Sequence, residues 1–222
     1  MRARIALIHA LAHSVAPINT AFARQWPDAV LMNLLDDSLS ADLARHGGQL
    51  DVAMHDRFAA LTDYAVQTGA HGVLFTCSAF GPCIEAASAR HPAIPVLKPN
   101  QAMIVDATSA ARAKSGALAR IGLIASFAPT LQSMPAEFPP GVHLDCELVE
   151  TAMQALNGGD PAAHDVAVAD AAQRLQGRGV DVIALAQFSM ARAADAVVAA
   201  TGLSVFTTPD SAIRLLQARL LR

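Results

Sequence analysis

Two similar stretches of sequence decide the fold prediction. Gly69–Cys77 reads Gly-Ala-His-Gly-Val-Leu-Phe-Thr-Cys, and Gly179–Gln187, 110 residues later, reads Gly-Val-Asp-Val-Ile-Ala-Leu-Ala-Gln. In each stretch a glycine is followed by a short apolar run that stops at a polar residue, which is typical of a buried strand with a turn before it. A second pair, Arg4–Ile8 and Arg120–Ile124, matches at an offset of 116 residues.

A third pair, Leu34–Asp36 and Leu148–Glu150, follows in the same order, so we interpret the sequence as a duplication. The alternative interpretation is that any two strand–helix–strand segments look alike. Strands separated by helical stretches indicate βαβ units and parallel sheets. The predicted fold class is therefore α/β, with two pseudo-symmetric lobes. Each lobe is expected to be a mostly parallel sheet flanked by helices, with the active site in the cleft between the lobes.

Prolines, glycines and capping residues set the expected boundaries of the elements. Pro95 places the fourth strand at a sheet edge or at a strand start. Strands are expected at residues 4–8, 29–35, 72–76, 94–97, 120–125, 142–149, 180–186 and 203–206. Helices are expected to begin at Pro17, at a Ser40 cap, at Leu50, at Pro82, at Pro129, at Asp160–Pro161 and at an Asp210 or Ser211 cap.

The composition excludes several classes of protein. Of the 222 residues, 53% are hydrophobic and 16% are charged, which is not the composition of a disordered chain. The net charge is −3 and no basic run stands out, which argues against a nucleic-acid partner. No apolar run of about 20 residues could span a membrane, and the first run stops at His9, too early for a signal peptide. With three cysteines, we expect reduced thiols and a cytoplasmic location.

Cys77 is the sharpest chemical feature, because it lies at a predicted strand end just before a helix. Backbone N–H groups and the helix dipole at that place stabilise a thiolate, which could take a proton from carbon or attack an electrophile. The alternative is a buried packing cysteine. Cys83, six residues later, is expected inside the helix as packing or as a redox partner of Cys77, and Cys146 is expected in the core of a strand.

Other polar residues follow the predicted strands. The hydroxyls of the serines among them could hold a carboxylate or enolate, although an ordinary helix cap is the commoner role of such a serine. Asp36 and Asp37 could be acid–base residues, but a capping role is favoured. No histidine or cysteine group has metal-ligand spacing, and no phosphate loop follows the first strand, so neither a metal nor a nucleotide is expected. The polar residues at these strand ends are Ser78, Ser126, Ser189, His9 and Thr208.

Four segments together give the chain a resemblance to the aspartate/glutamate/hydantoin racemase superfamily. They are Thr76–Ser78, the aligned Gln187, Asn33–Leu39, and Val205–Pro209 before the last helix. The resemblance covers essentially the whole chain. It implies two α/β lobes, residues 1–97 with 209–222 and residues 98–208, with one cysteine from each lobe facing a substrate. It also implies that no metal or organic cofactor is used, and a homo-oligomer is expected.

This chain departs from the superfamily pattern at the second cysteine, where Gln187 stands instead. The Thr-His that often follows that cysteine in amino-acid racemases is Phe188–Ser189 here. Because glutamine is neither an acid nor a base near neutral pH, a symmetric two-thiol racemisation is not expected.

The resemblance therefore implies a cofactor-independent racemase- or isomerase-like enzyme acting at the carbon α to a carboxyl or carbonyl group. Cys77 would be the single acid/base and Gln187 would orient the substrate. Ser78, Ser126, Ser189, His9 and Thr208 would bind a small carboxylate or hydantoin-like molecule. The alternatives are a decarboxylase of a malonate-type acid and a catalytically inactive relative that only binds a carboxylate.

Overall fold

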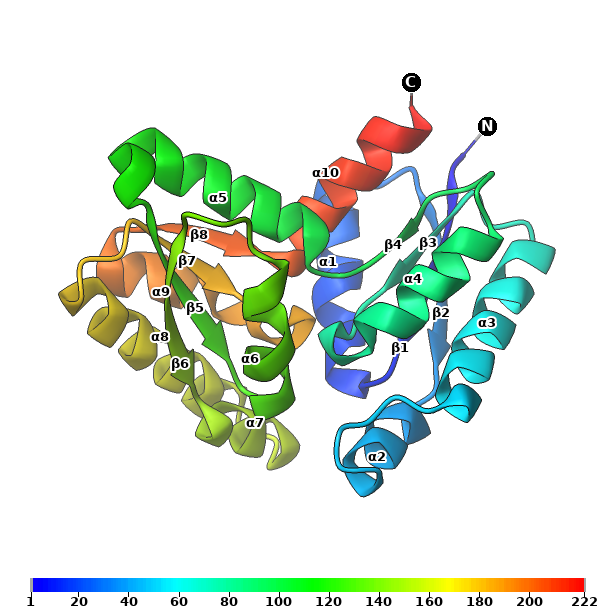
Figure 1. The fold of residues 1–222 in the computed structure, drawn as a ribbon, viewed down its shortest axis with the longest axis horizontal. Helices are drawn as coiled ribbons and strands as arrows, with labels where there is room; N and C mark the ends of the chain where they lie inside the picture. Colours follow the sequence, from blue (N-terminus) through cyan, green and yellow to red (C-terminus); the bar gives the residue numbers. More distant parts are fainter. Residues whose placement is uncertain (1, 222) are drawn as a thin grey trace. The chain divides into compact units, whose positions relative to one another are not determined.

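The computed structural model describes residues 2–221 and divides the chain into two compact units. The first unit comprises Met1–Pro99 together with Ala212–Arg222, and the second comprises Asn100–Ser211. Each unit contains one four-stranded sheet with helices on both of its faces (Figure 1). All strand pairs in both sheets are parallel, as the alternation of strands and helices predicts.

The first sheet has the strand order β2-β1-β3-β4. Its strands are β1 (Arg4–His9), β2 (Val30–Leu35), β3 (Gly72–Phe75) and β4 (Val96–Leu97). β4 lies at the edge and starts directly after Pro95, so the edge position predicted from this proline is confirmed.

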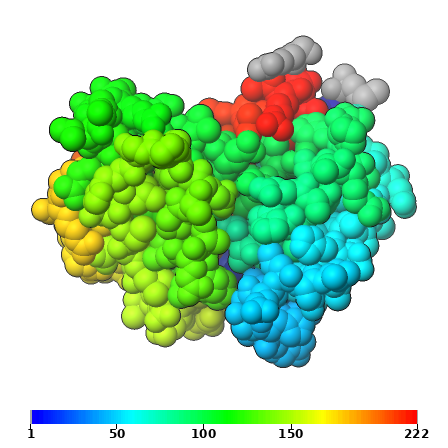
Figure 2. All heavy atoms as spheres, viewed as in Figure 1, coloured from blue at the N-terminus to red at the C-terminus, as the bar shows by residue number. Residues whose placement is uncertain are grey.

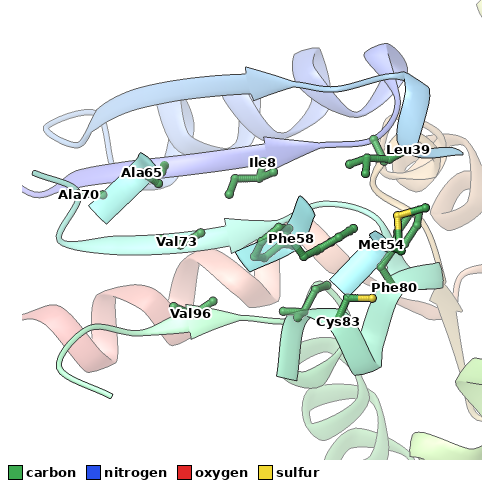
Figure 3. Packing of buried hydrophobic residues seen from close by; sticks show 14 of the residues in the cluster. Ile8, Leu39, Met54, Phe58, Ala65, Ala70, Val73, Phe80, Cys83 and Val96 are labelled. Atoms are coloured by element: carbon green, nitrogen blue, oxygen red, sulfur yellow. The ribbon is translucent and has the colours of Figure 1, made fainter. Parts of the chain in front are cut away.

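Alternate residues of β1 face opposite layers of helices. Ala6 and Ile8 belong to a cluster with Met54 and Phe58 of α3 (Figure 3). On the other face, a Cβ added to Gly72 would meet Leu216 of α10 at 3.3 Å, so the glycine permits close packing of this helix. The helices of this part of the chain are α1 (Val15–Gln25), α2 (Ser38–Arg45), α3 (Val52–Gln67), α4 (Gly81–Arg90) and α10 (Thr208–Leu220), with 3-10 turns η1 (Ala12–Ser14) and η2 (Ser78–Phe80).

The second sheet repeats the first, with the strand order β6-β5-β7-β8. Its strands are β5 (Arg120–Ala125), β6 (His143–Leu148), β7 (Val182–Leu185) and β8 (Ser204–Thr207). The helices of the second unit are α5 (Gln101–Ser115), α6 (Ala128–Ser133), α7 (Glu150–Asn157), α8 (Pro161–Gly177) and α9 (Ala194–Thr201), with 3-10 turns η3 (Gly116–Leu118), η4 (Met134–Glu137) and η5 (Phe188–Ala193).

The strand registers repeat at the offsets found in the sequence. Ile5 pairs with Gly72 in the first sheet, and Ile121 pairs with Val182 in the second. Gly69 and Gly179 both have φ near +80°, a conformation that L side chains rarely adopt. Each of these glycines turns the chain from the end of a helix into a central strand, which is why the repeat begins with glycine.

The third aligned pair is wrong by one residue. Leu35 is the partner of His9 at the end of β1, and Leu148 is the partner of Ala125 at the end of β5. Leu35 therefore corresponds to Leu148 rather than to Val149. Apolar residues alone could not fix this register, because both segments place several leucines and valines in a row.

Helix α8 faces the sheet of the second unit with tightly packed side chains. A Cβ added to Gly122 of β5 would lie 2.8 Å from the Ile183 Cδ1 atom and 3.0 Å from the Leu175 Cδ1 atom. The predicted start of this helix is confirmed, because the Asp160 side chain accepts a hydrogen bond from the backbone N–H of Ala163 at 2.9 Å.

Three other local predictions are wrong. Ser40 lies inside α2 rather than capping it, and its hydroxyl donates instead to the Ala10 carbonyl. The last helix begins at Thr208, so Asp210 and Ser211 lie within its first turn. Cys146 is exposed, because it lies on β6, an edge strand with only one neighbour. Helices α5, α7 and α9 had no sequence prediction.

Within residues 2–221, no helix combines the length and the apolar character needed to cross a membrane.

Candidate functional site

The carboxyl ends of parallel strands lie at one edge of each sheet, and this edge is where α/β proteins bind ligands. In the first unit this edge carries His9 at the end of β1, and Cys77 and Ser78 after β3. In the second unit it carries Ser126 after β5, Gln187 and Ser189 after β7, and Thr208 after β8. Each unit thus brings its own sequence-predicted residues together at one sheet edge.

Cys77 occupies the junction between β3 and the 3-10 turn η2. Its backbone is extended, with φ −119° and ψ 123°, and its thiol is partly buried. Burial raises the pKa of the Cys77 thiol to about 11, while hydrogen bonds with the Ala79 backbone and the Ser40 hydroxyl act in the opposite direction.

The sequence-based expectation of a stabilised thiolate is therefore wrong for this structure. The α4 helix starts only at Gly81, after η2, and desolvation of the thiol outweighs its hydrogen bond with the Ala79 backbone. Near neutral pH Cys77 carries its proton. Burial also raises the pKa of the Cys83 thiol to about 11, and it raises that of Cys146.

His9 at the end of β1 contacts β2 and the residue that follows β3. Its Nδ1 atom lies 2.9 Å from the Thr76 hydroxyl, and its Nε2 atom lies 2.9 Å from Oδ1 of Asn33. Because the Asn33 carbonyl oxygen only accepts, Nε2 is assigned the hydrogen and Nδ1 accepts from Thr76. Burial lowers the pKa of His9, so the ring is neutral near pH 7. The ring fixes Thr76, the residue that immediately precedes Cys77.

The Asp36 carboxylate accepts hydrogen bonds from one hydroxyl and one guanidinium, so its surroundings do not favour a role as a base. Burial acts to raise its pKa, but hydrogen bonds from Ser38 and Arg57 and the Arg57 charge outweigh it and lower the pKa. The Arg57 guanidinium lies 2.6 Å from the Asp36 Oδ2 atom. Asp37 is the N-cap residue of α2 and makes no side-chain capping bond.

Gln187 occupies in the second unit the position that Cys77 has in the first, directly before a 3-10 turn. Its Oε1 atom accepts two hydrogen bonds from Ser126, from the backbone N–H at 2.6 Å and from the hydroxyl at 3.0 Å. Both residues are nine-tenths or more buried. The amide carbonyl of Gln187 is therefore already hydrogen-bonded to Ser126, directly after β5. The Nε2 hydrogens are the groups that Gln187 can offer to a ligand.

Two buried polar atoms of the second unit lack a hydrogen-bond partner among the described residues. They are the Thr208 hydroxyl, at the start of α10, and Oδ1 of Asn100, before α5. Ser189 is also buried. The sequence did not indicate Asn100, nor the contacts of Asn33 and Thr76 with the His9 ring. A residue's place relative to its own strand does not show which residues of other strands it contacts.

Two open hollows among the described residues lie elsewhere. One, of about 570 Å³, is lined by residues 117–120 and 141–143 at the amino ends of β5 and β6. The other, of about 390 Å³, lies beside the start of β4 and includes His91 and Arg219. Neither contains a residue of the strand-end set. Within residues 2–221, no group of three or more His, Cys, Asp or Glu side chains could hold a metal ion.

Solved structures with this fold include several racemases. A glutamate racemase isoform from Bacillus anthracis is 16% identical with a TM-score of 0.69, and the match covers 97% of this chain and 81% of that one. The allantoin racemase from Klebsiella pneumoniae is 15% identical with a TM-score of 0.68, and the match covers 97% and 86%. A glycine-to-cysteine mutant of arylmalonate decarboxylase is 16% identical with a TM-score of 0.61, and the match covers 96% and 93%.

No protein-family model and no curated protein matches the sequence. The chain therefore shares its fold with glutamate and allantoin racemases and with arylmalonate decarboxylase. At the level of fold, this agrees with the resemblance to the aspartate/glutamate/hydantoin racemase superfamily.

Proposed function

We propose that this protein is a cofactor-independent, racemase- or isomerase-like enzyme that transfers a proton at the carbon α to a carboxyl or carbonyl group. The observation that carries the proposal is Cys77, a partly buried residue with a free thiol at the carboxyl end of a central parallel strand. Solved structures of glutamate and allantoin racemases with the same fold support the reaction class.

Cys77 is the acid/base of the proposed reaction. In its thiolate form it takes the α-proton, and the electrons of the broken C–H bond pass into an enediolate. The thiol then returns a proton to the same carbon or to a conjugated position. Because burial raises the pKa of Cys77 to about 11, its thiolate is scarce at neutral pH and strongly basic when it forms.

The proposed role of Gln187 is to orient the substrate. Glutamine cannot exchange protons with a carbon acid, and its carbonyl is occupied by Ser126, so its Nε2 hydrogens are suited to a substrate carboxylate. Ser78, Ser189 and Thr208 complete the proposed substrate-binding set. Of these, Thr208 brings a buried hydroxyl with no partner among the described residues. His9 and Ser126, which the resemblance also implies, support it indirectly, because the His9 ring is bonded to Thr76 and Asn33 and the Ser126 donors are bonded to Gln187.

A second candidate, decarboxylation of a malonate-type acid, is favoured by the protonation state of Cys77. In that reaction the C–C bond breaks first, carbon dioxide leaves, and its bonding electrons remain as an enediolate. The carbon then needs one proton, which a thiol of high pKa holds ready at neutral pH. The resulting thiolate regains its proton from water, so no second acid or base is required.

The test is hydrogen exchange and carbon dioxide release in D₂O, followed by NMR, with α-amino acids, hydantoins and malonate-type acids. The wild type and Cys146→Ser, which alters an exposed thiol on β6, are expected to act equally. Cys77→Ala is expected to lose about 10²- to 10⁴-fold in rate, the usual contribution of a general acid–base group.

Carbon dioxide release would identify the decarboxylase, and exchange without it would identify the isomerase. Full activity in Cys77→Ala would contradict both proposals. Binding of a carboxylate without either reaction would instead identify an inactive relative.

A further inference from the structure

The ring of His9 links the two strands on either side of β1 through its two nitrogen atoms. Its Nε2 atom lies 2.9 Å from Oδ1 of Asn33 on β2, and its Nδ1 atom lies 2.9 Å from the Thr76 hydroxyl directly after β3. The His9 side chain is fully buried, whereas Asn33 is exposed on an edge strand. This strand leads into α2, which lies at the surface of the first unit (Figure 2). The three residues therefore form a hydrogen-bonded chain from the surface to the residue that precedes Cys77.

Asn33 sets the direction of the hydrogen bonds in this chain. Its carbonyl oxygen only accepts, so Nε2 of His9 carries the ring hydrogen and Nδ1 accepts from Thr76. The Thr76 hydroxyl has a single hydrogen, and its other acceptor, the Ile8 carbonyl, is more distant at 3.4 Å. The hydroxyl is therefore directed at the ring, which fixes the rotation of the Thr76 side chain.

The matching positions of the second sheet carry no such chain. The strand registers and the backbone hydrogen bond at the end of each central strand identify these positions. Two of the three matching residues are alanines with 0% exposure, so they offer no polar side-chain atom. The matching residues are Ala125 for His9, Cys146 for Asn33 and Ala186 for Thr76.

The fold itself therefore does not require the polar chain. A buried imidazole costs free energy unless both of its nitrogen atoms find partners, whereas a buried alanine has no such requirement. The polar chain occurs in the unit whose central strand ends at the Cys77 thiol. The unit in which Gln187 stands at that place has alanines instead. This difference points to a role connected with the thiol.

We propose that Asn33 is a positioning residue for Cys77 and acts through His9 and Thr76. Asn33 holds the His9 ring with its hydrogen on Nε2, the ring holds the Thr76 hydroxyl, and Thr76 fixes the start of the turn that carries the thiol. None of the three residues exchanges a proton with the substrate. The inference rests on the proposed role of Cys77.

The test measures the alkylation rate of Cys77 by iodoacetamide at fixed pH, read from peptide masses. Asn33→Leu removes the acceptor of the ring, Thr76→Val removes the hydroxyl with little change in shape, and Thr76→Ser keeps the hydroxyl. Burial raises the pKa of the Cys77 thiol, so a looser turn that admits water should lower this pKa and speed alkylation. Asn33→Leu and Thr76→Val should react about three- to tenfold faster than the wild type, and Thr76→Ser should react like the wild type.

Nitrogen NMR of the His9 ring supplies a second measurement, which a purely structural role of Asn33 would not change. The wild type should carry the ring hydrogen on Nε2. In Asn33→Leu this hydrogen loses its acceptor, so a population with the hydrogen on Nδ1 and with Thr76 as the acceptor should appear. Unchanged ring signals in Asn33→Leu would overturn the inference.

Cys146→Leu is the matched control, because it places the same side chain at the same position of the other edge strand. It should leave the Cys77 rate at the wild-type value. A wild-type rate in Asn33→Leu, or an equal increase in Cys146→Leu or Thr76→Ser, would contradict the proposal. Asn33→Leu changes an exposed side chain, so it keeps the test valid if Thr76→Val disturbs the buried end of β3. Neither measurement needs a substrate, so the result is independent of whether the proposed enzymatic activity is found.

Discussion

Replacing Gln187 with methionine is expected to destabilise the second unit measurably. The side chains are of similar size, but methionine offers no acceptor to the backbone N–H and hydroxyl of Ser126, which lie 2.6 and 3.0 Å from the Gln187 Oε1 atom. Ser126 is only 3% exposed, so water cannot easily replace the lost acceptor. Leaving a buried N–H unsatisfied costs about 1–3 kcal/mol in the free energy of unfolding.

For a chain of this length, a loss of about 2 kcal/mol lowers the melting temperature by roughly 4–8 °C. Circular dichroism during heating measures this shift. Ser126→Ala should cost less, about 1 kcal/mol, because the backbone N–H keeps its acceptor. Gln173→Met is the matched control, since Gln173 is exposed and makes only a 3.4 Å contact. An unchanged melting temperature in Gln187→Met would refute the reasoning that Gln187 anchors the end of β5.

Three further outcomes are expected. Because burial raises the pKa of Cys77 to about 11, its rate of alkylation by iodoacetamide should rise roughly tenfold per pH unit between about pH 7 and 9. The exposed Cys146 should react before Cys77. A plateau in the Cys77 rate within that pH range would indicate a lower pKa. Gly122→Ala should cost roughly 1–3 kcal/mol by overpacking in urea titrations, whereas Gly81→Ala, where an added Cβ has no neighbour within 4 Å, should not destabilise; equal effects would contradict the packing argument. Asp160→Ala should cost about 0.5–2 kcal/mol by the same measurement through loss of the α8 cap, and no change would show that the cap is not needed.

The fold was largely predictable because its signals are local. The apolar runs after Gly69 and Gly179 are central strands, and the positive φ of both glycines explains why this residue begins each repeat. The capping pair Asp160–Pro161 fixed the start of α8 to the residue. Prediction failed where the local signal was weak. Serine is a common capping residue, but the Ser40 hydroxyl donates to the Ala10 carbonyl, 30 residues away along the chain.

The sequence alone determined which residues stand at the strand ends, because the period of apolar residues and the turn residues between them specify where each strand stops. It also determined that a thiol stands at the end of β3 and an amide at the same place after β7. Tertiary structure decided what these groups can do. The Cys77 thiol is desolvated, and the Gln187 carbonyl is bound to Ser126, 61 residues earlier. A pKa and a hydrogen-bond partner depend on atoms that only folding brings within a few ångströms, so neither could be predicted from the order of residues along the chain.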